Sequence, residues 1–227
     1  MPDTIERLAS DLLIALRRRV GVFRSRHRAD GERDEHRFVL GVTGIPGSGK
    51  STVARQLLEQ INRSMPDFAA VVGMDGYHLP NAVLEQRGLR LQKGSPGTFD
   101  VPGFVDLLQR LRQSPRRSVS APAYDRRVHE PVAGAVIIDA DTRLVIVEGN
   151  YLLLTDEPWL QVQPLLDEVW YLDTPLELAM GRVADRHRTG GKDAALTEQM
   201  IAGNDRPSAD IVTATRDSAD RIIRLDQ

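Results

Sequence analysis

The chain has 227 residues, of which 41% are hydrophobic and 27% charged, and its formal net charge is −2. That size suits one large α/β domain, and the near balance of charges argues against nucleic-acid and membrane-surface binding, which both need a sustained basic excess. No cysteine is present, so disulfides, thiol catalysis and cysteine metal sites are excluded.

The start of the chain is acidic and polar, and no stretch approaches the roughly 18–20 apolar residues that span a bilayer. These features predict a cytoplasmic protein. The charged segment from Ser25 to His36 is expected to be an exposed connector. It follows a predicted amphipathic helix, whose apolar residues recur three and four positions apart at Ile5, Leu8, Leu12, Leu16 and Val20. We therefore expect two parts, a helix with its connector at residues 1–30 and a single domain at residues 31–227.

From Arg37 onward, short β-branched runs alternate with stretches of helical periodicity. The strands that this pattern predicts are Phe38–Thr43, Ala69–Met74, Ala135–Ile138, Leu144–Glu148 and Glu168–Leu172, all buried, and a last strand at Ile222–Leu225. Helices are predicted at Ser51–Asn62, Pro102–Arg112 and Pro175–Arg188. Strands that alternate with helices indicate an α/β fold, a three-layer sandwich with a mostly parallel sheet and helices on both faces. Such a fold binds ligands beyond the carboxyl ends of its strands.

The strongest motif matches the Walker A pattern G-x-x-x-x-G-K-[ST], with an apolar strand before it and an amphipathic helix after it. Its glycines let the backbone curl so that N–H groups and the helix N-terminus face phosphate oxygens. Lys50 is expected to reach the β- and γ-phosphates, and the Ser51 hydroxyl to bind Mg²⁺. The motif predicts the P-loop NTPase fold, and the candidate nucleotide-binding residues are Gly44, Ile45, Pro46, Gly47, Ser48, Gly49, Lys50, Ser51 and Thr52.

Two acidic residues follow predicted strands, where side chains enter the ligand crevice. Asp75 comes just after one strand, and in a kinase its carboxylate would accept the proton of the attacking hydroxyl; the alternative is an ordinary Asp-Gly turn. Glu148 ends another strand and resembles a Walker B carboxylate that holds Mg²⁺ or its waters; the alternative is a plain strand-edge residue. Both acids are therefore candidates for the chemistry at the γ-phosphate.

The predicted helix Pro175–Arg188 leads into a glycine-rich segment, Thr189-Gly190-Gly191-Lys192. Arg182 and Arg186 are four residues apart on this helix and share one of its faces. They suit a lid that stabilises negative charge on the transferring phosphoryl group. The alternative is a solvated basic face.

Further segments extend the pattern beyond the P-loop. They are Met74-Asp75-Gly76-Tyr77-His78-Leu79-Pro80-Asn81, Lys93-Gly94-Ser95-Pro96-Gly97-Thr98-Phe99-Asp100, Pro122-Ala123-Tyr124-Asp125 with His129, Val145-Ile146-Val147-Glu148-Gly149, and Asn204-Asp205-Arg206-Pro207-Ser208-Ala209-Asp210. With these motifs the sequence resembles the superfamily of P-loop kinases that comprises uridine kinase, phosphoribulokinase and type I pantothenate kinase. It looks closest to a bacterial branch of nucleoside kinase-like or fructose transport system kinase-like proteins.

The resemblance implies roles for particular residues. It implies that Asp75 is the general base and that Asn204 lies in a segment closing the nucleotide site. It also implies an acceptor side built from His78, Lys93, Asp100, Tyr124, Arg126 and His129. Each has a plainer alternative: Asp100 would cap the next helix, Tyr124 would be a packing residue, and His129 would be a surface loop residue.

These features predict an ATP-dependent small-molecule kinase that transfers the γ-phosphoryl group, with Mg²⁺, to a hydroxyl of a nucleoside, a pantothenate-like alcohol or a sugar. Ser51 and Glu148 would hold the metal ion, and Arg186 and Asn204 would also contact the nucleotide. The predicted catalytic set is Asp75, Lys50, Glu148, Arg182 and Arg186.

The alternative is a regulatory or assembly P-loop NTPase that hydrolyses nucleotide without a metabolite acceptor. The sequence lacks the Asn-Lys-x-Asp motif of guanine-specific switches. The expected partners are a nucleoside triphosphate and a small hydroxylated substrate, with no nucleic acid and no membrane, in a monomer or homodimer.

Overall fold

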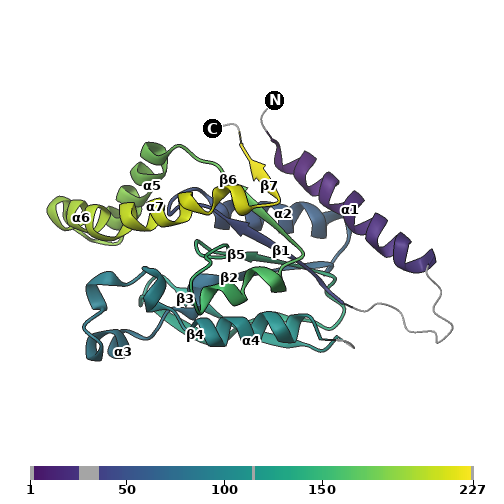
Figure 1. The fold of residues 1–227 in the computed structure, drawn as a ribbon, viewed down its shortest axis with the longest axis horizontal. Coiled ribbons are helices and arrows are strands. Elements are labelled where there is room, and N and C mark those ends of the chain that lie inside the picture. The colour runs from purple at the N-terminus through teal and green to yellow at the C-terminus, as the bar shows by residue number, and fades with distance from the viewer. Residues whose placement is uncertain (1–2, 26–35, 114–115, 226–227) are drawn as a thin grey trace.

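The computed structural model describes residues 3–25, 36–113 and 116–225, with side chains from 3–16, 36–113 and 116–225. Five parallel strands form its central sheet in the order β2-β5-β1-β6-β7 (Figure 1). The predicted parallel sheet is confirmed, with small differences in the bounds of two strands. The strands are β1 (Phe38–Thr43), β2 (Ala69–Gly73), β5 (Leu144–Glu148), β6 (Glu168–Leu172) and β7 (Arg221–Ile223).

Successive side chains of a strand point to opposite faces of the sheet. Both sets are apolar here because the sheet is buried on both sides. Along β5, Leu144 and Ile146 join a core that α1 and α2 cover, whereas Val145 and Val147 join a core that α4, α5 and α7 cover. The predicted three layers are therefore present. The helices are α1 (Ile5–Ser25), α2 (Lys50–Ser64), α4 (Val101–Leu111), α5 (Leu176–Thr189) and α7 (Arg206–Ala214).

Helix α1 packs on the sheet that follows it in the chain. Leu8 of α1 is buried in the same core as Trp170 of β6. Just before the helix, Asp3 forms a parallel β-bridge with Leu225, which follows β7. The predicted N-terminal helix is thus present and contributes to the core. Of the predicted connector Ser25–His36, Ser25 is the last residue of α1, and residues 26–35, with the boundary between residues 30 and 31, lie outside the described part of the chain.

A separate antiparallel hairpin consists of β3 (Val119–Asp125) and β4 (Glu130–Ile138). The prediction of a buried strand at Ala135–Ile138 is wrong in its environment, because this segment is the second half of β4 and most of β4 is exposed. Strand β3 was not predicted. Its Pro122 cannot donate to a ladder and lies where the register of the two strands shifts.

The chain after α5 is helical over a longer stretch than predicted. It forms α6 (Ala194–Met200), then a π-helical turn at Ile201–Asp205, then α7, and these elements lie together at one end of the molecule (Figure 1). A π-turn breaks the 3.6-residue period, which hides the helix from a search for amphipathic spacing. A short helix, α3 (Asn81–Gln86), was also missed. Within the described residues, every helix is too short or too polar to cross a lipid bilayer.

Candidate active site

The order of the strands places three functional segments side by side. Strand β5 lies between β2 and β1, so Glu148 at its end is in register with Gly73 of β2 and Val42 of β1. The P-loop follows β1, and Asp75 follows β2. Because the strands are parallel, these groups meet at the same edge of the sheet, where α/β folds bind ligands.

The P-loop folds around the ammonium group of Lys50. This side chain is buried, and its Nζ donates to the backbone oxygens of Gly44 at 2.8 Å and Ile45 at 2.9 Å. Burial lowers the pKa of Lys50 to about 8, and the negative charges of Glu148 and Asp75 oppose that shift. The Lys50 ammonium therefore lies within electrostatic reach of both predicted carboxylates.

Gly47 allows helix α5 to approach the P-loop closely. Its φ is 79°, and a Cβ at this position would lie 2.2 Å from the backbone oxygen of Ala179. We expect Gly47→Ala to destabilise the fold by about 1–3 kcal/mol and to weaken nucleotide binding, measured by thermal melting with and without MgATP.

The matched control for this substitution is Gly181→Ala on α5. A Cβ at Gly181 meets nothing within 4 Å, so this variant should be neutral or more stable by about 0.5–1 kcal/mol. Equal melting temperatures for the two variants would contradict the close approach at Gly47.

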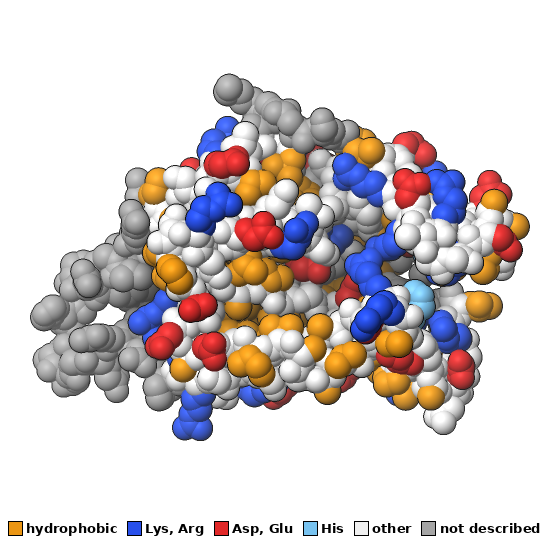
Figure 2. Space-filling model, turned by 180° about the vertical axis from the view of Figure 1, so that it is seen from behind, with side chains coloured by type: hydrophobic (Ala, Val, Ile, Leu, Met, Phe, Trp, Pro, Cys, Tyr) orange, Lys and Arg blue, Asp and Glu red, His pale blue; other side chains and the backbone are white. Residues whose placement is uncertain are grey.

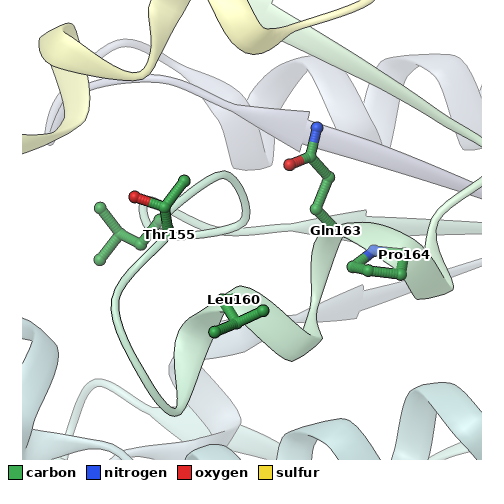
Figure 3. A pocket seen from close by; sticks show the side chains of 5 residues that line it. Thr155, Leu160, Gln163 and Pro164 are labelled. Atoms are coloured by element: carbon green, nitrogen blue, oxygen red, sulfur yellow. The ribbon is translucent and has the colours of Figure 1, made fainter.

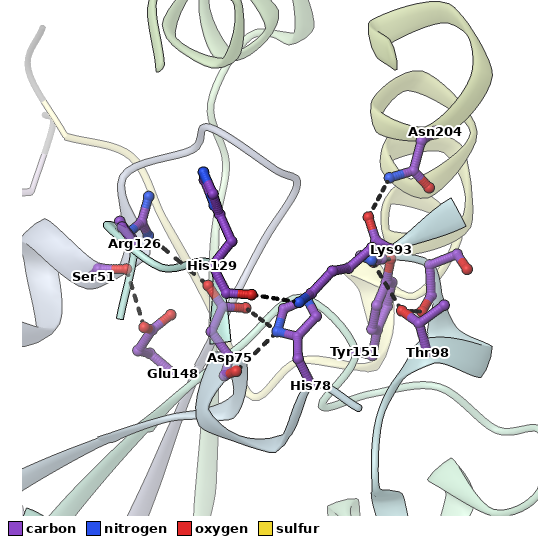
Figure 4. A network of polar contacts seen from close by, with 12 residues as sticks. Ser51, Asp75, His78, Lys93, Thr98, Arg126, His129, Glu148, Tyr151 and Asn204 are labelled. Carbon is purple, nitrogen blue, oxygen red and sulfur yellow. Dashed lines mark hydrogen bonds and ion pairs between the residues drawn. The ribbon is translucent and has the colours of Figure 1, made fainter. Parts of the chain in front are cut away.

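Ser51 and Glu148, the predicted metal-binding pair, are in contact. The Ser51 hydroxyl donates to Glu148 Oε1 at 3.0 Å (Figure 4). Burial raises the pKa of Glu148 to about 7, and the charge of Asp75 adds to that shift while Lys50 opposes it. A hydroxyl and a carboxylate are hard oxygen ligands that suit Mg²⁺, which usually takes further ligands from water and phosphate. The described residues contain no group of three or more His, Asp or Glu side chains that could hold an ion by themselves.

Asp75 faces the hairpin from the opposite side of the site. It lies in a 3-10 turn, Met74–Tyr77, and its side chain is 40% exposed. Its Oδ2 is 3.9 Å from Nη2 of Arg126, which follows β3 (Figure 4). The carboxylate therefore stands between the P-loop side and the hairpin side, where an acceptor hydroxyl could reach it.

His78 holds the turn that carries Asp75. Its Nδ1 lies 2.8 Å from the backbone oxygen of Asp75, and because a carbonyl oxygen only accepts, this nitrogen carries a proton. The ring packs against Phe99 and Tyr124, with centroid distances of 4.1 and 4.9 Å. Burial lowers the pKa of His78. The His78 ring therefore contacts the backbone of the turn that carries Asp75, and its predicted contact with substrate stays a prediction.

Lys93 contacts several acceptor-side residues (Figure 4). Its Nζ donates to Asn81 Oδ1 and to the backbone oxygen of His129, both at 2.7 Å, and lies 5.2 Å from the centroid of the Tyr124 ring. The side-chain amide of Asn204 donates to the backbone oxygen of Lys93 at 2.9 Å. Asn204 thus contacts the segment that carries Lys93, and its predicted contact with nucleotide stays a prediction.

Helix α5 carries the predicted lid arginines to the P-loop. Arg182 Nη1 lies 3.8 Å from the position that a Cβ on Gly49 would take, and the charge of Arg186 adds to the lowering of the Lys50 pKa. The far end of α5 is fixed by His187, whose Nε2 lies 2.9 Å from Asp205 Oδ2, with both side chains buried. Helix α5 is therefore tied to the π-turn that also carries Asn204.

Asp100 has the plainer function that the sequence offered for it. Asp100 caps α4, because its side chain accepts from the backbone N–H of Gly103 at 3.1 Å, and its contact with substrate stays a prediction. Sequence reasoning assigned no function to four other residues that make polar contacts around the site. Some of them lie in or beside the quoted motifs, and that position was their only signal in the sequence. They are Asn81, Glu130, Tyr151 and His187.

A hollow of about 390 Å³ lies away from these residues (Figure 3). It contains no charged side chain, so it does not compete with the P-loop edge as a place for a triphosphate. Its lining residues are Leu154, Thr155, Leu160, Gln163 and Pro164.

Comparisons with known proteins agree with this geometry. The sequence profile of the Phosphoribulokinase / Uridine kinase family matches residues 39–225. Protein YggC of Escherichia coli (strain K12) is 34% identical over 193 residues, which cover 84% of this chain and 79% of YggC. The solved structure of a proposed fructose transport system kinase from Silicibacter sp. TM1040 is 32% identical and superposes with a TM-score of 0.80, covering 97% of this chain and 98% of that chain.

A second solved structure supports the fold alone. YFH7 from Saccharomyces cerevisiae, a proposed P-loop-containing kinase, superposes with a TM-score of 0.81 at 21% identity, covering 99% of this chain and all of that one (100%). The family match extends over most of the chain and includes the P-loop, Asp75 and Glu148. This chain therefore belongs to the Phosphoribulokinase / Uridine kinase family and is a P-loop kinase, a phosphotransferase with an alcohol group as acceptor.

Proposed function

We propose that this kinase uses ATP and Mg²⁺ to phosphorylate a hydroxyl group of a small metabolite, with Asp75 as the general base. The acceptor oxygen forms a bond to the γ-phosphorus, the bond from the γ-phosphorus to the β–γ bridging oxygen breaks, and ADP leaves. The proton of the acceptor hydroxyl passes to the Asp75 carboxylate. Positioning and electrostatics supply most of the acceleration.

The remaining groups act on the phosphate side. Backbone N–H groups of the P-loop and the Lys50 ammonium bind the triphosphate, and Ser51 and Glu148 hold the Mg²⁺ ion or its waters. Arg182 and Arg186 approach from the lid and offset the charge on the transferring phosphoryl group.

The observation that carries the proposal is the position of Asp75. Its negative charge affects the pKa values of Lys50 and Glu148 on the phosphate side, and those of His78 and Tyr124 on the hairpin side. A general base for phosphoryl transfer must lie between the γ-phosphate and the acceptor. The Asp75 carboxylate fits this position because its charge acts on residues of both sides.

Acceptor-dependent release of ADP tests the proposal. We expect one class among nucleosides, pantothenate, sugars and sugar phosphates to raise ADP release from MgATP well above the basal rate of the purified protein. Basal hydrolysis that no acceptor stimulates would instead favour a regulatory NTPase.

A further inference from the structure

We infer that the phosphoryl acceptor carries an anionic group, a phosphate or a carboxylate, besides the hydroxyl that is phosphorylated, and that a cationic cluster at the hairpin tip recognises it. This inference rests on the proposed function, since it concerns the acceptor side of the same site. The cationic cluster consists of Arg90, Lys93, Arg126 and Lys192.

The four cations come from separate segments that meet at one place. Arg90 and Lys93 lie in and after a 3-10 turn beyond α3, Arg126 follows β3, and Lys192 follows the lid helix α5. At the hairpin tip, Lys93 Nζ donates to the backbone oxygen of His129 at 2.7 Å. Burial, and then the charges of Lys192, Lys93, Arg90 and Arg126, lower the pKa of the His129 imidazole. Figure 2 shows Lys and Arg side chains gathered around a histidine on one side of the molecule. Cations so far apart in sequence do not converge on a surface histidine through local helix or strand spacing.

Carboxylates neutralise this cluster only in part. Lys93 donates to two neutral oxygens, those of Asn81 and His129, and the nearby Glu130 carboxylate accepts from the backbone N–H of Asn81. Among the described residues, neither Lys93 nor Lys192 forms an ion pair with a carboxylate. Concentrated like charges are costly unless a counter-charge joins them, so the cluster favours an anion.

The other two cations have only distant carboxylate partners. Arg90 Nε lies 3.7 Å from Glu85 Oε1, with both side chains exposed, and Arg126 lies 3.9 Å from the proposed base Asp75. Both contacts are longer than a charge-assisted hydrogen bond of about 2.7–2.9 Å. Arg90 and Arg126 therefore keep donors that an acceptor anion could engage.

Most of this cluster lies on the hairpin side of the site. The charges of Arg90, Lys93 and Lys192 act on His129, whereas Arg126 acts on both sides, because its charge also opposes the raised pKa of Glu148. Asp75 lies between the two groups and interacts with residues of both sides. An anion bound at the hairpin tip would thus place the rest of the acceptor, with its hydroxyl, next to Asp75.

Matched pairs of acceptors test the inference. We would measure ADP release with ribose against ribose 5-phosphate, uridine against uridine 5′-phosphate, glycerol against glycerate, and pantothenol against pantothenate. We expect an anionic member to exceed its neutral partner in kcat/KM by about tenfold or more, as the loss of a charged hydrogen bond implies. Phosphate and carboxylate members tell the two kinds of anion apart. A neutral member that equals or exceeds its anionic partner would overturn the inference and leave the kinase proposal intact.

Substitutions in the cluster supply the second arm. Lys192→Gln is expected to raise KM for the anionic acceptor about tenfold, with a smaller effect on KM for ATP. Lys192→Arg keeps the positive charge and should have a KM for this acceptor close to that of the wild type. Arg127→Gln is the matched control, because Arg127 is 90% exposed and paired with Asp125 beside the cluster. The KM of this variant for the anionic acceptor should equal that of the wild type. Equal effects of Lys192→Gln and Arg127→Gln would count against the cluster.

A binding measurement covers the case in which no acceptor of the panel stimulates turnover. With the P-loop occupied by Mg²⁺ and a non-hydrolysable ATP analogue, the pKa of His129 is followed by NMR during titration with inorganic phosphate and with acetate. An anion in the cluster offsets the four cations, so we expect the pKa of His129 to rise in the wild type and not in Lys192→Gln. An unchanged pKa with both anions would overturn the inference, whereas a rise without any acceptor turnover would contradict only the proposed function.

Discussion

Asp75→Asn is expected to lower acceptor-stimulated ADP release by about 10²–10⁴-fold, while MgATP still binds to the P-loop. The amide has the shape of the carboxylate but cannot accept the proton of the acceptor hydroxyl at neutral pH. Because the His78 ring contacts the backbone oxygen of residue 75, the turn should keep its conformation in the variant. Steady-state kinetics with the best acceptor, together with a nucleotide-binding titration, measure the two effects separately.

Asp106→Asn is the control for this loss. Asp106 is exposed on α4 and pairs with Arg110, one helical turn away. Its variant should match the wild type within a factor of about two, since exposed pairs of this kind contribute little. A general-base function for Asp75 is untenable if Asp75→Asn keeps wild-type turnover.

Glu148→Gln is expected to lower turnover by about 10²–10³-fold and to raise the Mg²⁺ concentration that half-maximal activity requires. The amide can still accept the hydrogen bond that Ser51 donates, but it brings no charge to the metal ion. A titration of initial rate against Mg²⁺ at fixed ATP measures this change. Glu59→Gln on α2, which is exposed and paired with Arg55, serves as the control.

The same substitution is expected to stabilise the nucleotide-free protein above pH 7. The Glu148 carboxyl titrates near 4.5 in the unfolded chain and near 7 in the fold. Between these values the folded state keeps a proton that the unfolded state has released, so stability falls as the pH rises from about 4.5 to about 7 and stays lower above it. Gln does not titrate, and Glu148→Gln should exceed the wild type by roughly 1–3 kcal/mol at pH 8 and lose that advantage near pH 4.5.

Lys50 reduces this gain, because the charge of Glu148 raises the Lys50 pKa and helps to keep the buried ammonium charged. Melting temperatures of the two proteins from pH 4.5 to 8 therefore test the difference between them. Parallel curves across that range would show that Glu148 is not protonated in the folded protein at neutral pH.

The sequence predicted what depends on local pattern. Buried parallel strands read as continuous apolar runs, so β1 and β5 were found with their bounds, and the P-loop was found by its fixed spacing. Asp75 and Glu148 could be placed at one edge of the sheet because parallel strands share their carboxyl ends. Acceptor-side residues such as Lys93 and His129 were named through family resemblance alone.

The rest depends on contacts between distant segments. The hairpin strand β3 contains Pro122, and its partner β4 is exposed, so neither shows the pattern of a core strand. Arg90 and Lys192 are about a hundred residues apart, and only the tertiary fold places both of them around His129. The raised pKa of Glu148 likewise results from burial and from the neighbouring Asp75, which no local pattern reveals.

The β-bridge between Asp3 and Leu225 makes neighbours of the first and last described residues. Chains whose ends lie this close tolerate circular permutation, since a short linker can join the old ends while new ones are opened in an exposed turn. The P-loop, Asp75 and Glu148 all lie far from both ends in sequence, so relinking would leave every one of these segments uncut. A permuted chain with an intact site would show that the order of the segments along the chain is not needed to assemble the P-loop edge of the sheet.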